Sequence, residues 1–154
     1  MKKLACLCLV LSLLVLCGGC SPDAQPGAKE SGIDLDLSIA SGTVVYAQVS
    51  AMMTNAKHFL GKTIRIAGWF DYYVNPETGA VLTSCVIPDA TACCQQGIEF
   101  VWSGEHTYPD DYPVFGTEVT VTGRLESYEE GTSSYLHLVD TEVVWGRREM
   151  SALP

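Results

Sequence analysis

The chain of 154 residues is poor in basic side chains, with nine Lys and Arg against eighteen Asp and Glu. A protein that binds nucleic acid needs cationic groups to displace the counterions around the phosphates. The formal net charge of −9 therefore excludes nucleic acid as a partner. It also excludes an electrostatic attachment to anionic lipid.

Short motifs of several enzyme classes are missing as well. The chain has neither the Gly-x-Ser-x-Gly turn of serine hydrolases nor the His-Glu-x-x-His pair of zinc proteases. The cysteines beyond residue 42 include no Cys-x-x-Cys pair, which argues against a thioredoxin-like oxidoreductase. We therefore expect a non-enzymatic protein that acts by binding and needs no cofactor.

No apolar run is long enough to span a bilayer. The longest run, residues 4–16, is interrupted only by Ser12 and falls short of the roughly 20 residues that a membrane helix needs. Lys2 and Lys3 precede it, and small residues follow it. This order of a positive start, a short apolar stretch and a small-residue end is typical of a secretory signal peptide. The sequence therefore predicts a leader over residues 1–19.

The end of the leader resembles the bacterial lipobox, in which a lipid-modified cysteine becomes the first mature residue. The residues that carry the resemblance are Leu16-Cys17-Gly18-Gly19-Cys20. Cys17 departs from the family pattern, which usually has Leu there. The resemblance implies that Cys20 carries two or three acyl chains such as palmitate, enough for stable anchoring to the membrane. The protein is then expected on the extracytoplasmic face of the cell envelope. An ordinary signal peptide cleaved near Gly19 is the alternative.

Three further segments follow the leader. Residues 20–42 are rich in Pro, Gly, Ala, Ser and Asp, a composition that predicts a flexible tether. A single domain is expected over residues 43–147, and a short tail over 148–154. Removing Lys2 and Lys3 with the leader leaves seven basic residues against eighteen acidic ones, a net charge of −11. The lipid must therefore supply the attachment.

The period of the apolar residues changes along the domain. From Tyr46 to Leu60 they recur in steps of three and four, which predicts an amphipathic helix near residues 44–60. Gly61 stands where a left-handed cap would end it. Beyond Gly61 the period becomes two, the pattern of half-buried strands. Five strands are predicted, at residues 64–71, 80–87, 97–102, 118–125 and 135–145, the last of them as one strand or a bent pair.

Two strand segments repeat a glycine pattern. Gly61 opens a strand that contains Gly68, and Gly116 opens one that contains Gly123. Glycine inside a strand marks a bulge or bend of the kind that closes a small barrel. The pattern resembles uncharacterised bacterial lipoproteins with an OB-fold-like domain. The resemblance implies a mainly β fold, a five-stranded OB-like Greek-key barrel preceded by one amphipathic helix, and no particular activity. A β-sandwich is the competing fold.

Three cysteines remain in the domain: Cys85, Cys93 and Cys94. Outside the cytoplasm, a disulfide from Cys85 to either of the others is the simplest expectation. The alternative is a Zn²⁺ or Cu⁺ site, which would make the chain a metal-handling or redox protein. The ligand that completes the metal site would be His106, His137 or Asp89. Adjacent cysteines can share one ion only at a turn, because successive side chains of a strand point to opposite faces. A third alternative is that the thiols are buried and unpaired.

The segment between the third and fourth strands is acidic and aromatic. The side chains that suit a ligand cleft are Glu105, His106, Tyr108, Asp110, Asp111 and Tyr112. No regular Asp-x-Asp-x-Asp-Gly calcium loop is present. A solvated loop fixed by Pro109 and Pro113 is the alternative. The expected partner is an envelope protein, a peptide or a glycan, bound through the barrel face and residues 103–116.

Overall fold

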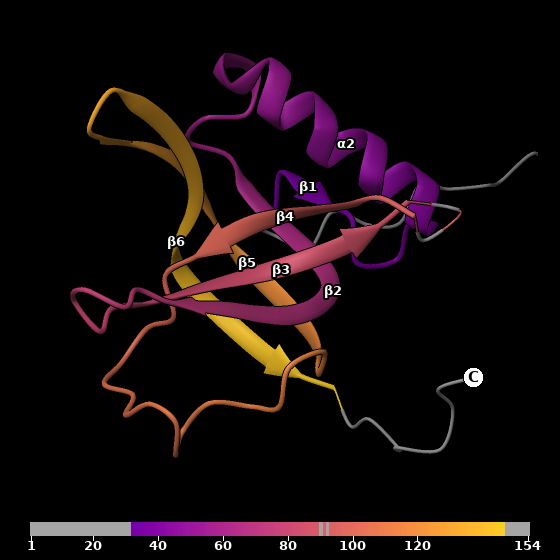
Figure 1. Ribbon diagram of the computed structural model, residues 1–154. Coiled ribbons are helices and arrows are strands. Elements are labelled where there is room, and N and C mark those ends of the chain that lie inside the picture. The colour runs from indigo at the N-terminus through magenta and orange to yellow at the C-terminus, as the bar shows by residue number, and fades with distance from the viewer. Residues whose placement is uncertain (1–31, 90, 92, 147–154) are drawn as a thin grey trace, which may run out of the picture.

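One β-sheet organises the chain in the computed structural model, which describes residues 32–89, 91 and 93–146 (Figure 1). Outside these residues lie the predicted leader, the predicted acylation site Cys20, the first part of the predicted tether and the predicted tail. Among the described residues, no helix is both long and apolar enough to cross a bilayer. In chain order the elements are β1 (Leu35–Asp36), α2 (Gly42–Thr54), the 3₁₀ helix η1 (Ala56–His58), β2 (Thr63–Val74), β3 (Val81–Pro88), β4 (Gln95–Phe100), β5 (Glu118–Glu130) and β6 (Ser133–Trp145).

The sheet closes into a barrel because β2 pairs with two different strands of the barrel. Its first half pairs with β5 and its second half with β3. The strand order β2-β3-β4-β6-β5 therefore returns to β2. The pairing of β4 with β6 is parallel, and the other barrel pairs are antiparallel. The predicted fold, a mainly β, five-stranded OB-like barrel preceded by one helix, is confirmed, and the β-sandwich is excluded.

Two glycines lie where the barrel strands bend. Gly68 stands where β2 leaves β5 and begins to pair with β3. A Cβ at this position would lie 2.6 Å from the carbonyl oxygen of Val86, so that only glycine fits. Gly123 stands at a register shift between β5 and β6. These are the two glycines whose repeated spacing predicts a bulge or bend. The register shift confirms the prediction at Gly123, and Gly68 lies where β2 changes its partner.

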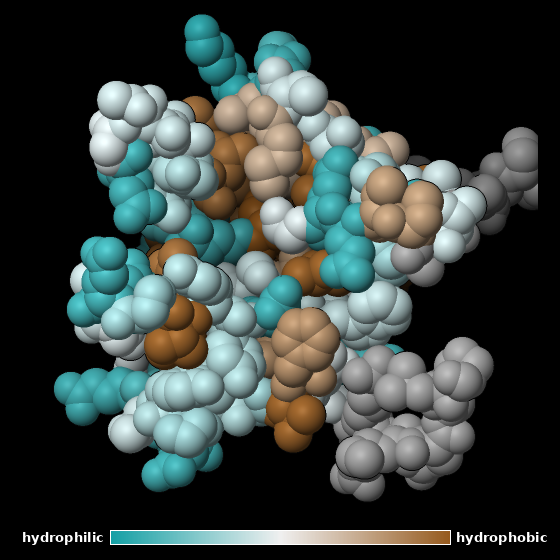
Figure 2. Space-filling view, in the orientation of Figure 1, coloured by the Kyte–Doolittle hydropathy of each residue, from teal (hydrophilic) through white to brown (hydrophobic). Residues whose placement is uncertain are grey.

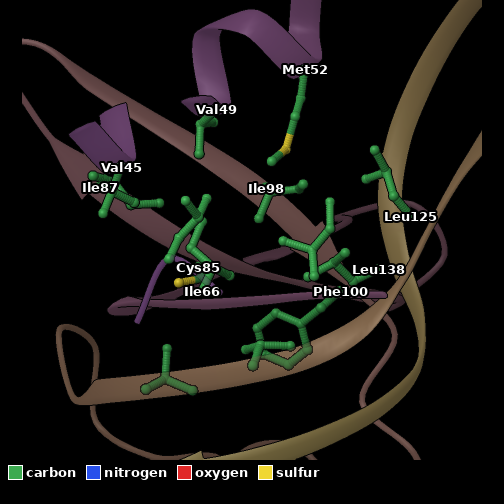
Figure 3. Packing of buried hydrophobic residues seen from close by; sticks show 14 of the residues in the cluster. Val45, Val49, Met52, Ile66, Cys85, Ile87, Ile98, Phe100, Leu125 and Leu138 are labelled. Atoms are coloured by element: carbon green, nitrogen blue, oxygen red, sulfur yellow. The ribbon is translucent and has the colours of Figure 1, made fainter. Parts of the chain in front are cut away.

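Helix α2 packs across one end of the barrel (Figure 1). Its buried side chains are Val45, Val49 and Met52, which point toward Ile87 and Ile98 in Figure 3. The predicted helix end at residue 60 is wrong, because the α-helix ends at Thr54 and η1 follows it. Asn55 leaves the helical region with φ −143° and ψ 52°, consistent with the preference of Asn for helix ends. Gly61 does have the expected left-handed conformation, with φ of +79°.

The folded part begins before the predicted boundary at residue 43. β1 pairs in parallel with the start of β2, and Leu37 is buried in the core. Asp36 adds an ion pair to Arg65, with 3.3 Å between the carboxylate oxygen and the guanidinium nitrogen. Residues 35–37 therefore belong to the domain and not to the tether. The average composition of residues 20–42 does not reveal this short stretch, which packs onto the barrel.

The predicted strand alternation matches the core. The inward side chains of β2, β4 and β5 are buried: Ile64, Ile66, Phe70, Ile98, Phe100, Val119, Val121 and Leu125. β5 and β6 are longer than predicted at their shared end, because β5 continues to Glu130 and β6 begins at Ser133. The extra residues form a hairpin that projects from the barrel beside α2 (Figure 1).

Candidate functional site

A groove opens where β4 and β6 separate. These strands pair at only two positions, Glu99 with His137 and Phe100 with Leu138. Away from these positions the β5–β6 hairpin diverges from β4, with the end of α2 nearby (Figure 1). The resulting groove has a volume of about 770 Å³. In Figure 2, hydrophobic atoms floor the hollow between the helix and the hairpin, and hydrophilic residues border it.

Several large apolar or aromatic side chains line this groove without being covered. They come from α2, β2, β3, β6 and the segment after η1, and they are between 39% and 57% exposed: Met53, Leu60, Tyr73, Leu82 and Tyr135. Single exposed apolar residues are common on soluble proteins, but a gathered patch of them usually marks a contact surface. The groove therefore has the character of a binding site.

The charge of the groove is negative. Among the described residues that line it, Asp71 and Glu99 are carboxylates and none is basic. The Tyr128 hydroxyl donates a hydrogen bond to Glu99 Oε2 at 2.7 Å. The Tyr128 ring packs against Tyr135 and His137. Desolvation raises the pKa of Tyr128, and the adjacent Glu99 raises it further, so the hydroxyl remains a donor at neutral pH. An aromatic stack thus fixes one carboxylate at the edge of the groove.

Two strand edges beside the groove lack a strand partner among the described residues. Residues 95–98 of β4 pair with β3 alone, and residues 133–136 of β6 pair with β5 alone. An exposed strand edge offers backbone N–H and C=O groups to an extended peptide, which can bind as an added strand. The groove therefore combines apolar side chains, carboxylates and backbone hydrogen-bonding groups.

The predicted ligand loop packs against the barrel through its aromatic residues. The His106 ring stacks on Trp102 with 3.5 Å between ring centroids. Tyr108 and Tyr112 both contact Tyr72, at centroid distances of 5.5 and 6.1 Å. Tyr72 also lines the groove. None of the loop residues 103–116 lines the groove itself, and the rings of His106, Tyr108 and Tyr112 hold the loop against the barrel.

The acidic residues of the loop do not converge. Asp111 Oδ2 accepts a hydrogen bond from the Thr107 N–H at 2.6 Å, which closes a turn. Glu105 and Asp110 are exposed to solvent. In the part of the chain that the structure describes, none of these three belongs to a group of side chains close enough to share a cation. Among the described residues, the predicted ligand loop therefore supplies neither a wall of the groove nor a cluster of cation ligands.

The three cysteines of the domain occupy two different environments. All three are free thiols in the structure. Cys85 is completely buried among core residues (Figure 3), and burial raises the pKa of its thiol to about 12. This thiol is therefore protonated and inert at neutral pH. Cys93 and Cys94 are exposed in the turn between β3 and β4, where their sulfur atoms lie 3.6 Å apart.

Asp89 organises this turn. Its Oδ1 accepts hydrogen bonds from the backbone N–H groups of Thr91 and Cys93, at 3.1 and 3.0 Å. Desolvation raises the pKa of Asp89, but hydrogen bonds from the Cys93 thiol, the Thr91 hydroxyl and the backbone of Cys94 and Cys93 outweigh it, so that the pKa lies below its ordinary value. The ligand atoms of Asp89, Cys93 and Cys94 all lie within 4.8 Å of one another. Of the three predicted additional donors, the structure thus brings Asp89 to the exposed cysteines.

The fold and the groove define a five-stranded β-barrel domain with an open, partly apolar groove. The chain itself matches no family model, and no curated protein or solved structure matches it either. The function must therefore be inferred from the chemistry of the site.

Proposed function

We propose that the chain is a lipid-anchored lipoprotein whose barrel is a non-enzymatic binding module on the extracytoplasmic face of the cell envelope. The lipobox-like residues that end at Cys20 support the anchor. The net charge of −11 beyond the leader supports attachment by lipid and not by electrostatic attraction to the membrane surface. The missing enzyme motifs support a role in binding.

The observation that carries the binding role is the groove. Its apolar side chains are 39–57% exposed although they gather in one hollow of about 770 Å³. Exposed apolar surface in water raises the free energy of the free protein, and burying it against a partner recovers roughly 25 cal/mol for each Å² covered. A surface that contacts only water would gain no free energy from gathering apolar side chains in this way.

The chemistry of the groove favours an extended peptide segment of an envelope protein. The free edges of β4 and β6 suit a peptide backbone, and the exposed Leu82 and Tyr135 suit apolar side chains. Asp71 and Glu99 suit a Lys or Arg side chain, which would also pack against the tyrosine rings. We therefore expect a partner segment that combines apolar and basic residues. A glycan is the other outcome that the test distinguishes.

A charge reversal tests this proposal. The purified protein is used to select from a displayed library of short random peptides, and glycan binding is measured in parallel. We expect selected peptides rich in basic and apolar residues. Glu99→Lys should weaken their binding at least tenfold, on the order expected when like charges meet at an interface. Fluorescence anisotropy with a selected peptide measures the change.

Glu142→Lys is the matched control, because it makes the same charge change on an exposed residue of β6 that does not line the groove. Its affinity for the selected peptide should stay close to that of the unaltered protein. The proposal fails if both variants weaken binding equally, because the effect would then reflect net charge alone. It also fails if glycans are bound and no peptide is selected.

A further inference from the structure

The turn between β3 and β4 holds two thiols at a separation that suits one metal ion. Two thiolates at about 2.3 Å from one tetrahedral Zn²⁺ lie roughly 3.8 Å apart. The Cys93 and Cys94 sulfur atoms are 3.6 Å apart. Adjacent cysteines on an extended strand could not reach one ion, but these precede β4 and lie in a turn. The condition for a shared ion is therefore met.

Asp89 supplies a third donor close to the Cys93 sulfur, with all three ligand atoms within 4.8 Å of one another. A thiolate and a carboxylate oxygen on one Zn²⁺ lie roughly 3.6 Å apart, and Asp89 Oδ2 is 3.3 Å from the Cys93 sulfur. The Thr91 hydroxyl contacts both ligands, at 3.0 Å from Asp89 Oδ2 and 3.1 Å from the Cys93 sulfur. Such outer contacts orient the ligands of a metal and strengthen its binding.

We propose that Asp89, Cys93 and Cys94 bind one Zn²⁺ ion through one carboxylate oxygen and two thiolates, with the fourth position open to water. The mixed donor set selects the metal, because Cu⁺ prefers sulfur ligands alone and Mg²⁺ or Ca²⁺ prefers oxygen ligands alone. Binding converts two thiols to thiolates, so each bound ion releases two protons to the solvent. The site does not include Cys85 and is separate from the groove.

Zinc titration of the full-length chain, purified under reducing conditions without oxygen, tests this site. We expect one more Zn²⁺ per chain to bind to the unaltered protein than to the variant that combines Cys93→Ser and Cys94→Ser. Asp89→Asn keeps the hydrogen-bond acceptor of the turn but removes the charge, and should weaken binding at least tenfold. Cys85→Ala, the matched control, should bind zinc as the unaltered protein does. Elemental analysis gives the number of ions, and calorimetry in two buffers gives the protons released.

Three results would overturn the proposal, and the third comes from mass spectrometry. One is equal zinc content in the unaltered chain and in the double serine variant, both still folded by circular dichroism. The second is a loss of zinc in Cys85→Ala, which would place the ligands elsewhere. If mass spectrometry finds Cys93 bridged to Cys94 and the reduced protein takes up no additional zinc, the pair is a redox couple and the metal site is rejected.

Discussion

Replacing Gly68 with alanine is expected to lower the free energy of unfolding by about 3 kcal/mol or more. The added Cβ would lie 2.6 Å from the carbonyl oxygen of Val86 and 2.8 Å from the Cys85 sulfur. Neither atom can move aside easily, because one belongs to the backbone of β3 and the other is fully buried. The bend that lets β2 pair with both β5 and β3 would therefore be distorted. Urea unfolding followed by tryptophan fluorescence measures the loss.

Gly97→Ala is the matched control for this prediction. Gly97 is also a strand glycine next to Val86, but a Cβ there would lie 3.5 Å from the nearest side-chain atom, an ordinary contact. Its unfolding free energy should change by no more than about 1 kcal/mol. If Gly68→Ala unfolds at the same urea concentration as Gly97→Ala, the close approach at Gly68 is not what restricts that position.

Cys20→Ser is expected to abolish fatty-acid labelling of the protein in its host. A lipobox uses the thiol of one cysteine, and a serine hydroxyl cannot replace it. The processed wild-type chain should carry the mass of two or three acyl chains on Cys20, each contributing roughly 0.8 kcal/mol per buried CH₂ to membrane binding. Metabolic labelling with a fatty acid and mass spectrometry of the first mature residue measure both effects.

Cys17→Ser is the matched control, because Cys17 is the neighbouring cysteine of the same segment and departs from the lipobox pattern. Labelling and the mass of the mature end should be unchanged in this variant. A wild-type chain that begins at an unmodified Cys20 would show that an ordinary signal peptide was cleaved near Gly19. The anchor, and with it the assigned face of the envelope, would then be rejected.

The barrel could be predicted because its strands follow simple local rules. Alternation places Ile64, Ile66 and Phe70 on one side of β2, and the structure buries all three. The repeat of Gly68 and Gly123 predicted the two bends that closure requires. β1 could not be predicted, because two residues have no measurable period and their pairing depends on β2, nearly thirty residues further on.

The groove is harder to predict than the fold because it depends on where strands separate. Alternation alone could have marked Leu82 and Tyr135 as outward-facing apolar positions. Nothing local reveals that β4 and β6 pair at only two positions and leave a hollow between them. In the loop, the sequence predicted Tyr108 and Tyr112 as ligand residues, but the tertiary fold packs both against Tyr72 and neither lines the groove.

The cysteines show the same distinction between local and tertiary information. Sequence spacing predicted that Cys93 and Cys94 can share an ion only at a turn, and the structure places them in one. Sequence spacing could not distinguish these two cysteines from Cys85, which is close in sequence but points from β3 into the core. Nor could the sequence show that Asp89, and not His106 or His137, is the donor beside these cysteines. That depends on how the turn folds.

Site-specific photo-crosslinking in the host tests the central claim, that the groove contacts a partner. A photoreactive residue replaces Leu82, which is 41% exposed in the groove, or Val144, which is 56% exposed and lies outside it. We predict that irradiation joins the chain to an envelope protein from position 82 and not from position 144. Crosslinks from position 144 alone, or none from position 82 in cells that retain the anchored protein, would contradict the account.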